Sequence, residues 1–229
     1  FLAGETTKSI SITVKGDNLD EANETYYVDL SAPSNATITD NQGLGTITDN
    51  DGTPTLTIND SSVTEDDLGT DITASFTITL SAQSALTITV DYATANSTAL
   101  QPSDYTTASG TLTFLAGETT KSVSVTVKGD NLDEANETYY VDLSAPSNAT
   151  ITDNQGLGTI TDNDGTPTLT INDSAVTEDD LGTDITASFI VALSAPSALT
   201  VTVDYATANN TALQPSDYTT ASGTLTFLA

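Results

Sequence analysis

Apolar and polar residues alternate in short runs along the whole chain. Residues 122–127 place their valines on one face and Ser and Thr on the other, and residues 138–143 alternate in the same way. A period of two predicts β-strands with one buried and one solvated face. No segment shows a helical apolar period for more than about one turn. The pattern therefore predicts an all-β protein.

Seven such runs fall between residues 53 and 165 and are separated by turn-forming Asp, Asn, Gly and Pro residues. The expected strands are residues 55–58, continued past a kink by Val63, then 74–80, 86–93, 111–114, 122–127, 138–143 and 158–161. About seven strands in roughly 100 residues is the size of one antiparallel, Ig-like β-sandwich. The expected inward-facing residues are Leu56, Ile58, Val63, Phe76, Ile78, Leu80, Leu86, Ile88, Val90, Tyr92, Leu112, Phe114, Val123, Val125, Val127, Tyr139, Val141, Leu143 and Ile160.

The sequence repeats itself, because Phe1 recurs as Phe114 and as Phe227, a period of 113 residues (114 − 1). Residues 1–116 and 114–229 differ at nine positions, and no acidic residue changes between them. The chain is therefore predicted to be a tandem array of β-sandwich domains.

The acidic turn segment 161–167 is the expected boundary between successive domains. On this phasing residues 53–165 form a complete domain, residues 1–52 form the C-terminal half of a domain, and residues 166–229 form the N-terminal half of another. Neither half is expected to close a core alone, because each would expose strand edges and an apolar face. A neighbouring identical repeat is expected to complete each half, either through chain continuity or through strand complementation between subunits.

The charge balance is strongly acidic, with 32 Asp and Glu residues against 4 basic residues and a net charge of −28. Such a chain repels phosphates and anionic lipid, which excludes nucleic acid as a partner and favours cations. The absence of Cys and His excludes disulfides, imidazole catalysis and most zinc sites. No apolar run is long enough to span a bilayer, so membrane insertion is not expected.

Residues 129–144 form an acidic loop that runs straight into the expected strand 138–143, and they are repeated letter for letter as residues 16–31. One end of the sheet is expected to be crowded by the acids Asp130, Asp133, Glu134 and Glu137, with Lys128 as the nearby basic residue. Two like charges about 4 Å apart repel by roughly 4 kcal/mol at an effective dielectric constant near 20. A folded loop of this kind needs a cation, and oxygen ligands without His or Cys indicate calcium.

Four segments carry a family resemblance: VTEDDLG (63–69), SDYTTASGTLTFLAGE (103–118), DNLDEANETYYVDLS (130–144) and GTITDND (158–164). In this order and spacing they resemble the Calx-beta domain, which occurs in sodium/calcium exchangers, an integrin β-subunit and many bacterial surface proteins. The resemblance implies a calcium-binding β-sandwich whose ions lie at one tip, close to the next domain.

The resemblance also implies which residues bind calcium. In the complete domain the implied ligands are Glu65, Asp104, Asp130, Glu134, Glu137, Asp162, Asn163 and Asp164. A second site would combine Asp17, Glu21, Glu24, Asp49, Asn50 and Asp51 with Glu178 and Asp217 of a neighbouring copy. Asn131, Ala135, Asn136 and Asn163 stand where the family can carry acids, so the number of ions stays open.

Other acidic residues have less specific readings. Asp66, Asp67 and Asp133 are open between a ligand and a turn or solvated charge, and Asp60 is open between a neighbouring site and the kink before Val63. Turn-forming or solvated roles are expected for Asp71, Asp91, Asp142 and Asp153.

The function favoured by the sequence is structural: a repeat module of a calcium-stiffened extracellular fibre or adhesin stalk, built from identical repeats end to end on a bacterial cell surface. The alternative is a calcium-dependent binding module that recognises a glycan or a cell-surface partner, with Tyr140 as the clearest exposed aromatic candidate. An enzyme is not expected, because an acidic tip provides neither an apolar pocket nor two acids with separated pKa values.

Overall fold

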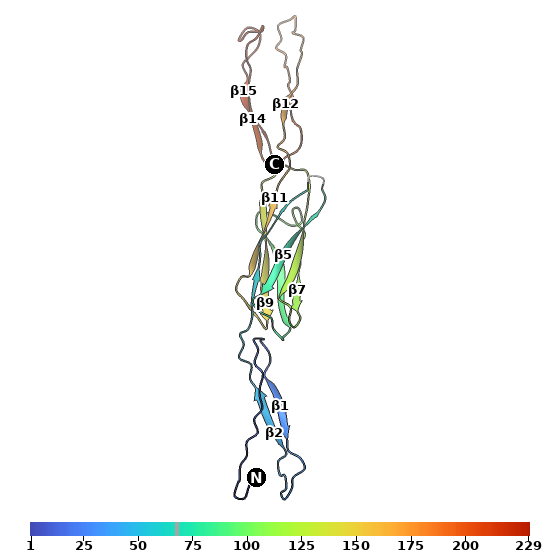
Figure 1. Ribbon diagram of the computed structural model, residues 1–229. Coiled ribbons are helices and arrows are strands. Elements are labelled where there is room, and N and C mark those ends of the chain that lie inside the picture. Colours follow the sequence, from blue (N-terminus) through green and yellow to red (C-terminus); the bar gives the residue numbers. More distant parts are fainter. Residues whose placement is uncertain (67–68) are drawn as a thin grey trace.

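A computed structural model describes residues 1–66 and 69–229, and in this part of the chain every regular element is a β-strand. The strands are β1 (Glu24–Asp29), β2 (Gln42–Ile47), β3 (Thr55–Ile58), β4 (Ser61–Thr64), β5 (Ile72–Leu80), β6 (Ile88–Asn96), β7 (Ser109–Phe114), β8 (Thr120–Val127), β9 (Glu137–Ser147), β10 (Thr150–Ile151), β11 (Gln155–Thr161), β12 (Leu169–Ile171), β13 (Val191–Leu193), β14 (Val201–Ala206) and β15 (Ser222–Phe227). Figure 1 shows an elongated molecule with β1 and β2 at one end, β3 to β11 in the middle and β12 to β15 at the other end. Among the described residues, no helix has the length and apolar character needed to cross a membrane.

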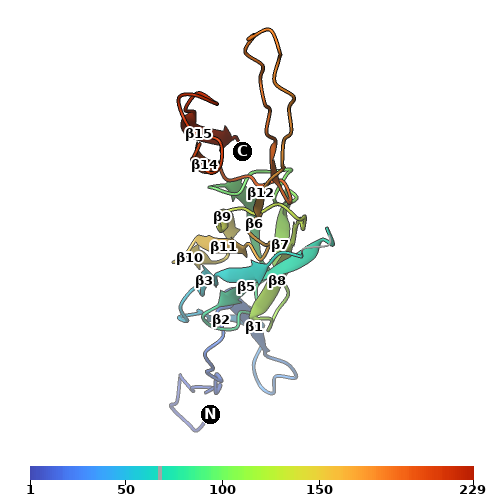
Figure 2. The ribbon, with the colours of Figure 1, turned by 90° about the horizontal axis from the view of Figure 1, so that it is seen from above.

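The middle of the chain is a two-layered β-sandwich, which confirms the predicted fold class. One sheet has the order β10-β3-β5-β8 and the other has the order β4-β11-β9-β6-β7. Figure 2, which looks along the long axis, shows them as separate layers. The pairing is antiparallel except at two edges, where β10 runs parallel to β3 and β11 runs parallel to β4.

Those parallel pairs arise because the first strand of the sandwich breaks and changes sheets. The break is at Asn59 and Asp60, where the predicted kink lies. Asn59 Oδ1 accepts a 2.5 Å hydrogen bond from the Thr77 amide of β5, and Asp60 Oδ1 accepts a 2.8 Å bond from the Leu157 amide of β11. The two neighbouring side chains thus bond to opposite sheets, and Asp60 serves the kink rather than a metal site.

The core lies between the two sheets of the sandwich and agrees closely with the predicted inward set. Val63, Tyr92 and Leu112 are only partly buried but pack against it, and Leu86 is half-buried. The alternation missed Tyr105, which is fully buried although it lies in an irregular segment. Its ring stacks on the Tyr139 ring at 4.5 Å between centroids, and its hydroxyl donates a 2.5 Å hydrogen bond to Asn96 Oδ1.

Tyr139 occupies space that its cross-strand neighbour leaves free. It lies opposite Gly158 in the β9–β11 ladder, and a Cβ at Gly158 would lie 2.4 Å from the Tyr139 ring. The same pair recurs in the β1–β2 hairpin, where a Cβ at Gly45 would lie 2.4 Å from the Tyr26 ring. Glycine is required here because the tyrosine ring covers the strand beside it.

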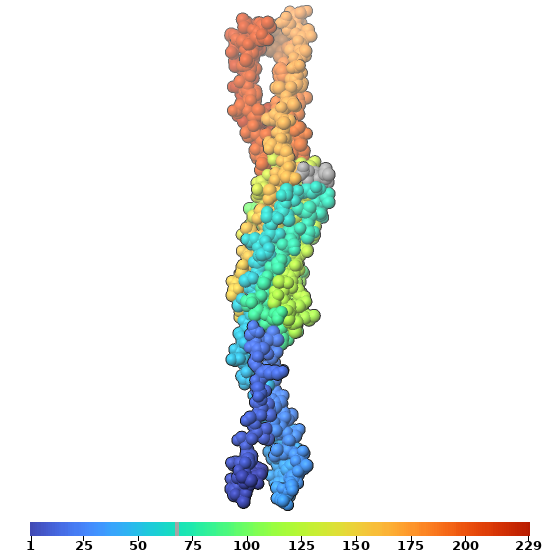
Figure 3. All heavy atoms as spheres, in the orientation of Figure 1, coloured from blue at the N-terminus to red at the C-terminus, as the bar shows by residue number. Residues whose placement is uncertain are grey.

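Residues 1–52 and 166–229 have the same alternation of apolar residues as the sandwich, but no second sheet of the described residues covers these apolar residues. Val123 of the sandwich is 2% exposed, whereas its repeat counterpart Ile10 is 64% exposed. Phe76 is fully buried, whereas its counterpart Phe189 is 57% exposed. The pairs β1–β2, β12–β13 and β14–β15 each form an isolated two-stranded sheet, and Figure 3 shows the last two pairs as separate arms. Burial of this pattern therefore depends on both layers being present.

We expect Gly158→Ala to destabilise the protein, because the new methyl group would overlap the Tyr139 ring. Overpacking of this kind costs roughly 1–3 kcal/mol, measurable as a lower urea midpoint of unfolding. Gly165→Ala is the matched control, because nothing lies within 4 Å of a Cβ at that position. Equal losses in the two variants would contradict the packing argument.

Candidate metal centre

One end of the central sandwich gathers the acidic residues that the sequence singled out. Glu65 directly follows β4, while Asp162 and Asp164 follow β11. Because β4 and β11 are parallel neighbours, both strands end at the same edge of the sheet. The Glu65 amide donates a 3.1 Å hydrogen bond to the Thr161 carbonyl, which holds the two strand ends together.

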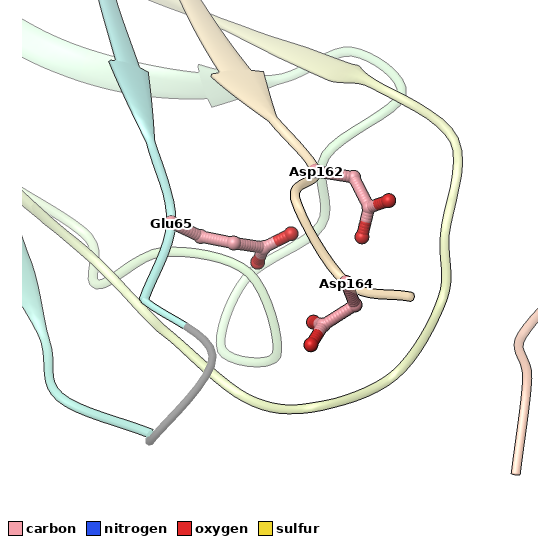
Figure 4. A group of neighbouring side chains, drawn as sticks. All are labelled: Glu65, Asp162 and Asp164. Atoms are coloured by element: carbon pink, nitrogen blue, oxygen red, sulfur yellow. The ribbon is translucent and has the colours of Figure 1, made fainter. Parts of the chain in front are cut away.

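The carboxylates at this end form two groups that could each hold a metal ion. Glu65, Asp162 and Asp164 form the first acidic group, and Figure 4 shows their side chains converging from β4 and from the segment after β11. The second acidic group consists of Asp104, Glu134 and Glu137. In each group the carboxylate oxygens lie within 4.8 Å of one another. These six residues come from segments that are far apart in the sequence.

Burial and the charges of neighbouring carboxylates raise the pKa of Glu65 in the first acidic group. Loss of water contact is the largest cause that raises the pKa of Glu65 to about 7, followed by the charges of Asp130, Asp162 and Glu134. The side-chain hydrogen bond between Glu65 and Asp162 raises the pKa further. Because Glu65 is buried, water screens the repulsion between its carboxylate and the neighbouring negative charges poorly.

The second acidic group shows the same behaviour. Loss of water contact raises the pKa of Glu137 to about 8, together with a hydrogen bond to Asp104 and the charges of Asp104, Glu134 and Glu65. Loss of water contact, then Asp130 and Asp104, also raises the pKa of Glu134. The charges of Glu65 and Glu134 act across both groups, so the groups form one electrostatic unit.

The nearby basic side chain does not neutralise this unit. Lys128 Nζ lies 2.5 Å from Asp71 Oδ2, so its charge is paired outside the two acidic groups. Asp71, expected to be a turn or solvated charge, is exposed and forms this ion pair. The other ion pairs among the described residues join Lys8 to Glu5 and Lys121 to Glu118.

Local hydrogen bonds fix the shape of the acidic loop. Asp130 Oδ1 accepts a 2.8 Å bond from the Leu132 amide. Asn136 Oδ1 accepts a 3.0 Å bond from the Asp162 amide, and Asp162 Oδ1 accepts a 3.2 Å bond from the Glu134 amide. Asn136, at a position where the family can carry an acid, thus ties the loop to the segment that leaves the domain.

The acidic hairpin of residues 1–52 repeats this arrangement. Loss of water contact raises the pKa of Glu21, followed by the charges of Asp17, Glu24, Asp49 and Asp51. The Leu19 amide bonds to Asp17 Oδ1 at 3.0 Å, and the Asp49 amide bonds to Asn23 Oδ1 at 2.9 Å. These two hydrogen bonds match those of Leu132 to Asp130 and of Asp162 to Asn136 in the central sandwich.

The remaining predicted ligands lie outside the two acidic groups. Glu178 and Asp217 are exposed, and in the described ranges 1–66 and 69–229 no group of three candidate ligands includes them. Asn50 and Asn163 are also exposed. Asp217 Oδ2 accepts a 2.8 Å bond from the Leu213 amide, as Asp104 Oδ2 does from Leu100 at 2.6 Å in the complete domain.

The acidic residues whose role the sequence left open have different surroundings in the structure. Asp66 Oδ2 accepts a 3.0 Å bond from the Thr70 amide, and Asp67 lies outside the described residues. Asp133 is buried, belongs to neither acidic group and accepts a 3.1 Å hydrogen bond from Ser197 Oγ. The expected turn or surface acids Asp91, Asp142 and Asp153 accept hydrogen bonds from Thr111 Oγ1, from Gln155 Nε2 and from the Gln155 amide.

Comparison with known proteins identifies the family. A family model described as the Calx-beta domain matches residues 1–62, 49–175 and 162–229. The chain belongs to the Calx-beta family. Calx-beta domains bind Ca²⁺, which agrees with the cofactor expected from the sequence. A comparison with curated protein sequences finds no match.

Solved structures of Calx domains are similar to this Calx-beta chain. The apo-form Calx CBD1 domain is 20% identical with a TM-score of 0.43, over 49% of this chain and 100% of that one. CBD12 from CALX1.2 is 23% identical with a TM-score of 0.44, over 76% of this chain and 71% of that one. The calcium binding domain CBD12 of CALX1.1 is 22% identical with a TM-score of 0.44, over 76% and 70% of the two chains.

The donor set of the two acidic groups fits calcium. All six side chains offer carboxylate oxygens, and such hard ligands suit Ca²⁺, which accepts six to eight oxygens in a flexible arrangement. Burial, followed by the charges of neighbouring carboxylates, raises the pKa of Glu65, and the nearby Lys128 is paired with Asp71 outside the site. An ion held by Glu65, Asp162 and Asp164, or by Asp104, Glu134 and Glu137, would supply the missing positive charge.

In the presence of chelator we expect stability to fall as the pH rises from about 4.5, the ordinary value for glutamate, to about 8. Glu65 and Glu137 have raised pKa values in the folded protein, so over this range the folded state binds more protons than the unfolded state. Thermal unfolding between pH 4.5 and 8.5 measures the trend. Glu65→Gln should flatten the curve, and a stability that rises over this range would contradict the argument.

Proposed function

We propose that this chain is a structural module of a calcium-stiffened extracellular fibre or adhesin stalk. One observation carries the proposal: both acidic groups lie at the end of the sandwich where the chain leaves for the next repeat. Only residues 162–168 separate β11 from β12, and Asp162 and Asp164 belong to this short linker. A cation bound there would connect the linker to the domain that precedes it.

The chain's own residues explain how a bound ion would stiffen this linker. Calcium would supply positive charge to carboxylates that otherwise repel one another. Glu65 comes from the end of β4, Asp164 from the linker, and Glu134 from the acidic loop. Holding these segments in one place would reduce the freedom of the linker and keep successive domains in line.

The setting that suits such a module is the outside of a bacterial cell. A net charge of −28 keeps the molecule soluble and attracts cations, and extracellular calcium sites work at about 10⁻⁴ to 10⁻³ M. We also propose that residues 1–52 and 166–229 are halves of this domain type that neighbouring repeats complete. The support is that their core-type residues, such as Ile10 and Phe189, are exposed although their counterparts are buried.

A calcium-dependent binding module for a glycan or a cell-surface partner is the competing proposal. Its candidate contact residue, Tyr140, is half-buried on β9. Electron microscopy with and without chelator separates the two proposals. Straight particles that bend without calcium support a stiffened stalk, whereas a calcium-independent shape combined with calcium-dependent glycan capture would support the binding module.

We expect calcium to raise the melting temperature markedly and magnesium to raise it weakly. Magnesium demands a near-ideal octahedron, which a flexible set of carboxylates satisfies poorly. At one hundred times the dissociation constant, an ion stabilises the folded state by about 2.7 kcal/mol for each independent site. Calorimetry with each ion and with chelator measures the shift. A melting temperature that chelator leaves unchanged would rule out calcium binding in this role.

We also expect Glu134→Gln and Asp164→Asn to weaken calcium binding and to bend the molecule. Each removes one carboxylate from an acidic group. Asp142→Asn is the matched control: it removes the same charge from β9, where Asp142 bonds to Gln155. Titration calorimetry and small-angle X-ray scattering give the two readouts. Equal losses in all three variants would show that bulk charge, and not a site, binds the ion.

A further inference from the structure

Two buried aspartates lie in the acidic loops but belong to neither acidic group. Asp20 and Asp133 occupy the same position in successive repeats, and each is 8% exposed. A buried carboxylate is costly unless it has a hydrogen-bonding partner. The partner of each lies in the next domain along the chain, 64 residues later.

At the first junction, Asp20 contacts the turn between β5 and β6. The Ser84 hydroxyl lies 3.0 Å from the Asp20 carbonyl oxygen and 3.3 Å from Asp20 Oδ2. The Ala85 amide donates a 3.0 Å hydrogen bond to the same carbonyl, and Asp20 and Ser84 form a parallel β-bridge. One residue thus offers both its backbone and its side chain to the next domain.

The second junction repeats this contact. Ser197 Oγ lies 3.1 Å from both the carbonyl oxygen and Oδ2 of Asp133, and the Ala198 amide donates to the Asp133 carbonyl at 3.1 Å. The residue before the serine is Gln83 at the first junction and Pro196 at the second. The contact tolerates this change because its donors are the serine hydroxyl and the amide that follows it.

The turn of the receiving domain orients the serine before it meets the aspartate. The Leu86 amide donates a 3.0 Å hydrogen bond to Ser84 Oγ, and the Leu199 amide does the same to Ser197 Oγ. A hydroxyl that accepts a bond on one side keeps its hydrogen available for another acceptor. The Ser-Ala-Leu turn is therefore a preformed donor surface for an aspartate of the acidic loop.

We propose that this aspartate and the Ser-Ala-Leu turn form a docking contact that sets the register between successive domains. The partner that fits the surface is the acidic loop of a preceding Calx-beta domain. The proposal rests on the proposed function in one respect, which is that calcium strengthens the contact. Asp133 directly precedes Glu134, whose carboxylate belongs to the second acidic group and whose amide bonds to Asp162.

Coupling between the ion and the docking contact has to be reciprocal. If calcium strengthens the contact by some factor, then the intact contact strengthens calcium binding by the same factor. A change at Ser197, which belongs to neither acidic group, must then alter calcium affinity. Mutation of a serine that takes no part in the docking contact would leave the calcium affinity unchanged.

The experiment compares the full chain with Ser197→Ala, with Ser197→Thr and with the control Ser124→Ala, which removes an exposed hydroxyl from β8. Hydrogen exchange of the Ala198 amide is followed by NMR in chelator and in calcium, and titration calorimetry gives the calcium affinity. Circular dichroism of each variant checks its folding. Loss of one such hydrogen bond should lower Ala198 protection by about 2- to 10-fold in chelator.

We expect Ser197→Ala to lower Ala198 protection and to weaken calcium binding, by at most the factor by which calcium raises that protection in the unmodified chain. Ser197→Thr, which keeps a hydroxyl, should retain most of both, and Ser124→Ala should match the unmodified chain. If the Ala198 amide is equally protected in Ser197→Ala and in the unmodified chain, both in chelator, the docking contact is wrong. Unchanged calcium affinity in Ser197→Ala would overturn the coupling.

A failure of the proposed function gives a different result. If the unmodified chain shows no calcium-dependent heat and no melting shift, calcium stiffening is wrong and the coupling falls with it. The docking contact is then decided by the chelator comparison alone, because the Asp133 and Ser197 bond involves no ion.

Discussion

Repulsion among carboxylates at one end of the sandwich is the constraint on which the arrangement of this chain depends. Six of them meet in two groups because parallel β4 and β11 end together beside the acidic loop. Burial raises the pKa of Glu65 and Glu137, and the nearby Lys128 is paired with Asp71. Folding thus concentrates negative charge where β4 and β11 end, next to the segment that leads to β12.

The same sequence pattern has two outcomes in one molecule. The β8 segment is buried in the central sandwich, where a second sheet covers its inner face, and its repeat counterpart around Ile10 is exposed. Hydrophobic burial needs a partner surface, since removing apolar area from water supplies the stabilisation. Among the described residues, the apolar pattern of the repeat is therefore buried where two sheets pack face to face and exposed in the isolated two-stranded sheets.

Much of the candidate site could be predicted from the sequence, because the resemblance to the Calx-beta domain implies that acids from four segments meet at one end of the sandwich. Glu65, Asp104, Glu134, Glu137, Asp162 and Asp164 all lie in the two acidic groups. Asp133 stayed open between a ligand and a turn or solvated charge, because its hydrogen-bonding partner Ser197 lies 64 residues further along the chain. Tyr105 was missed because no period of two extends into its irregular segment.

The sequence by itself determined the strands, the 113-residue repeat, the core face and the acidic chemistry, because alternation and charge are local properties of the chain. Only the tertiary structure decided which acids share a group. It also decided that the strand broken at Asn59 and Asp60 contributes to both sheets. The hydrogen bonds of Asp20 and Asp133 to serines 64 residues later are a further tertiary feature. These outcomes depend on contacts between residues about 20 to 100 positions apart, such as Asp60 with Leu157 and Asp133 with Ser197. Distances of that kind are set by packing and register, which no local pattern encodes.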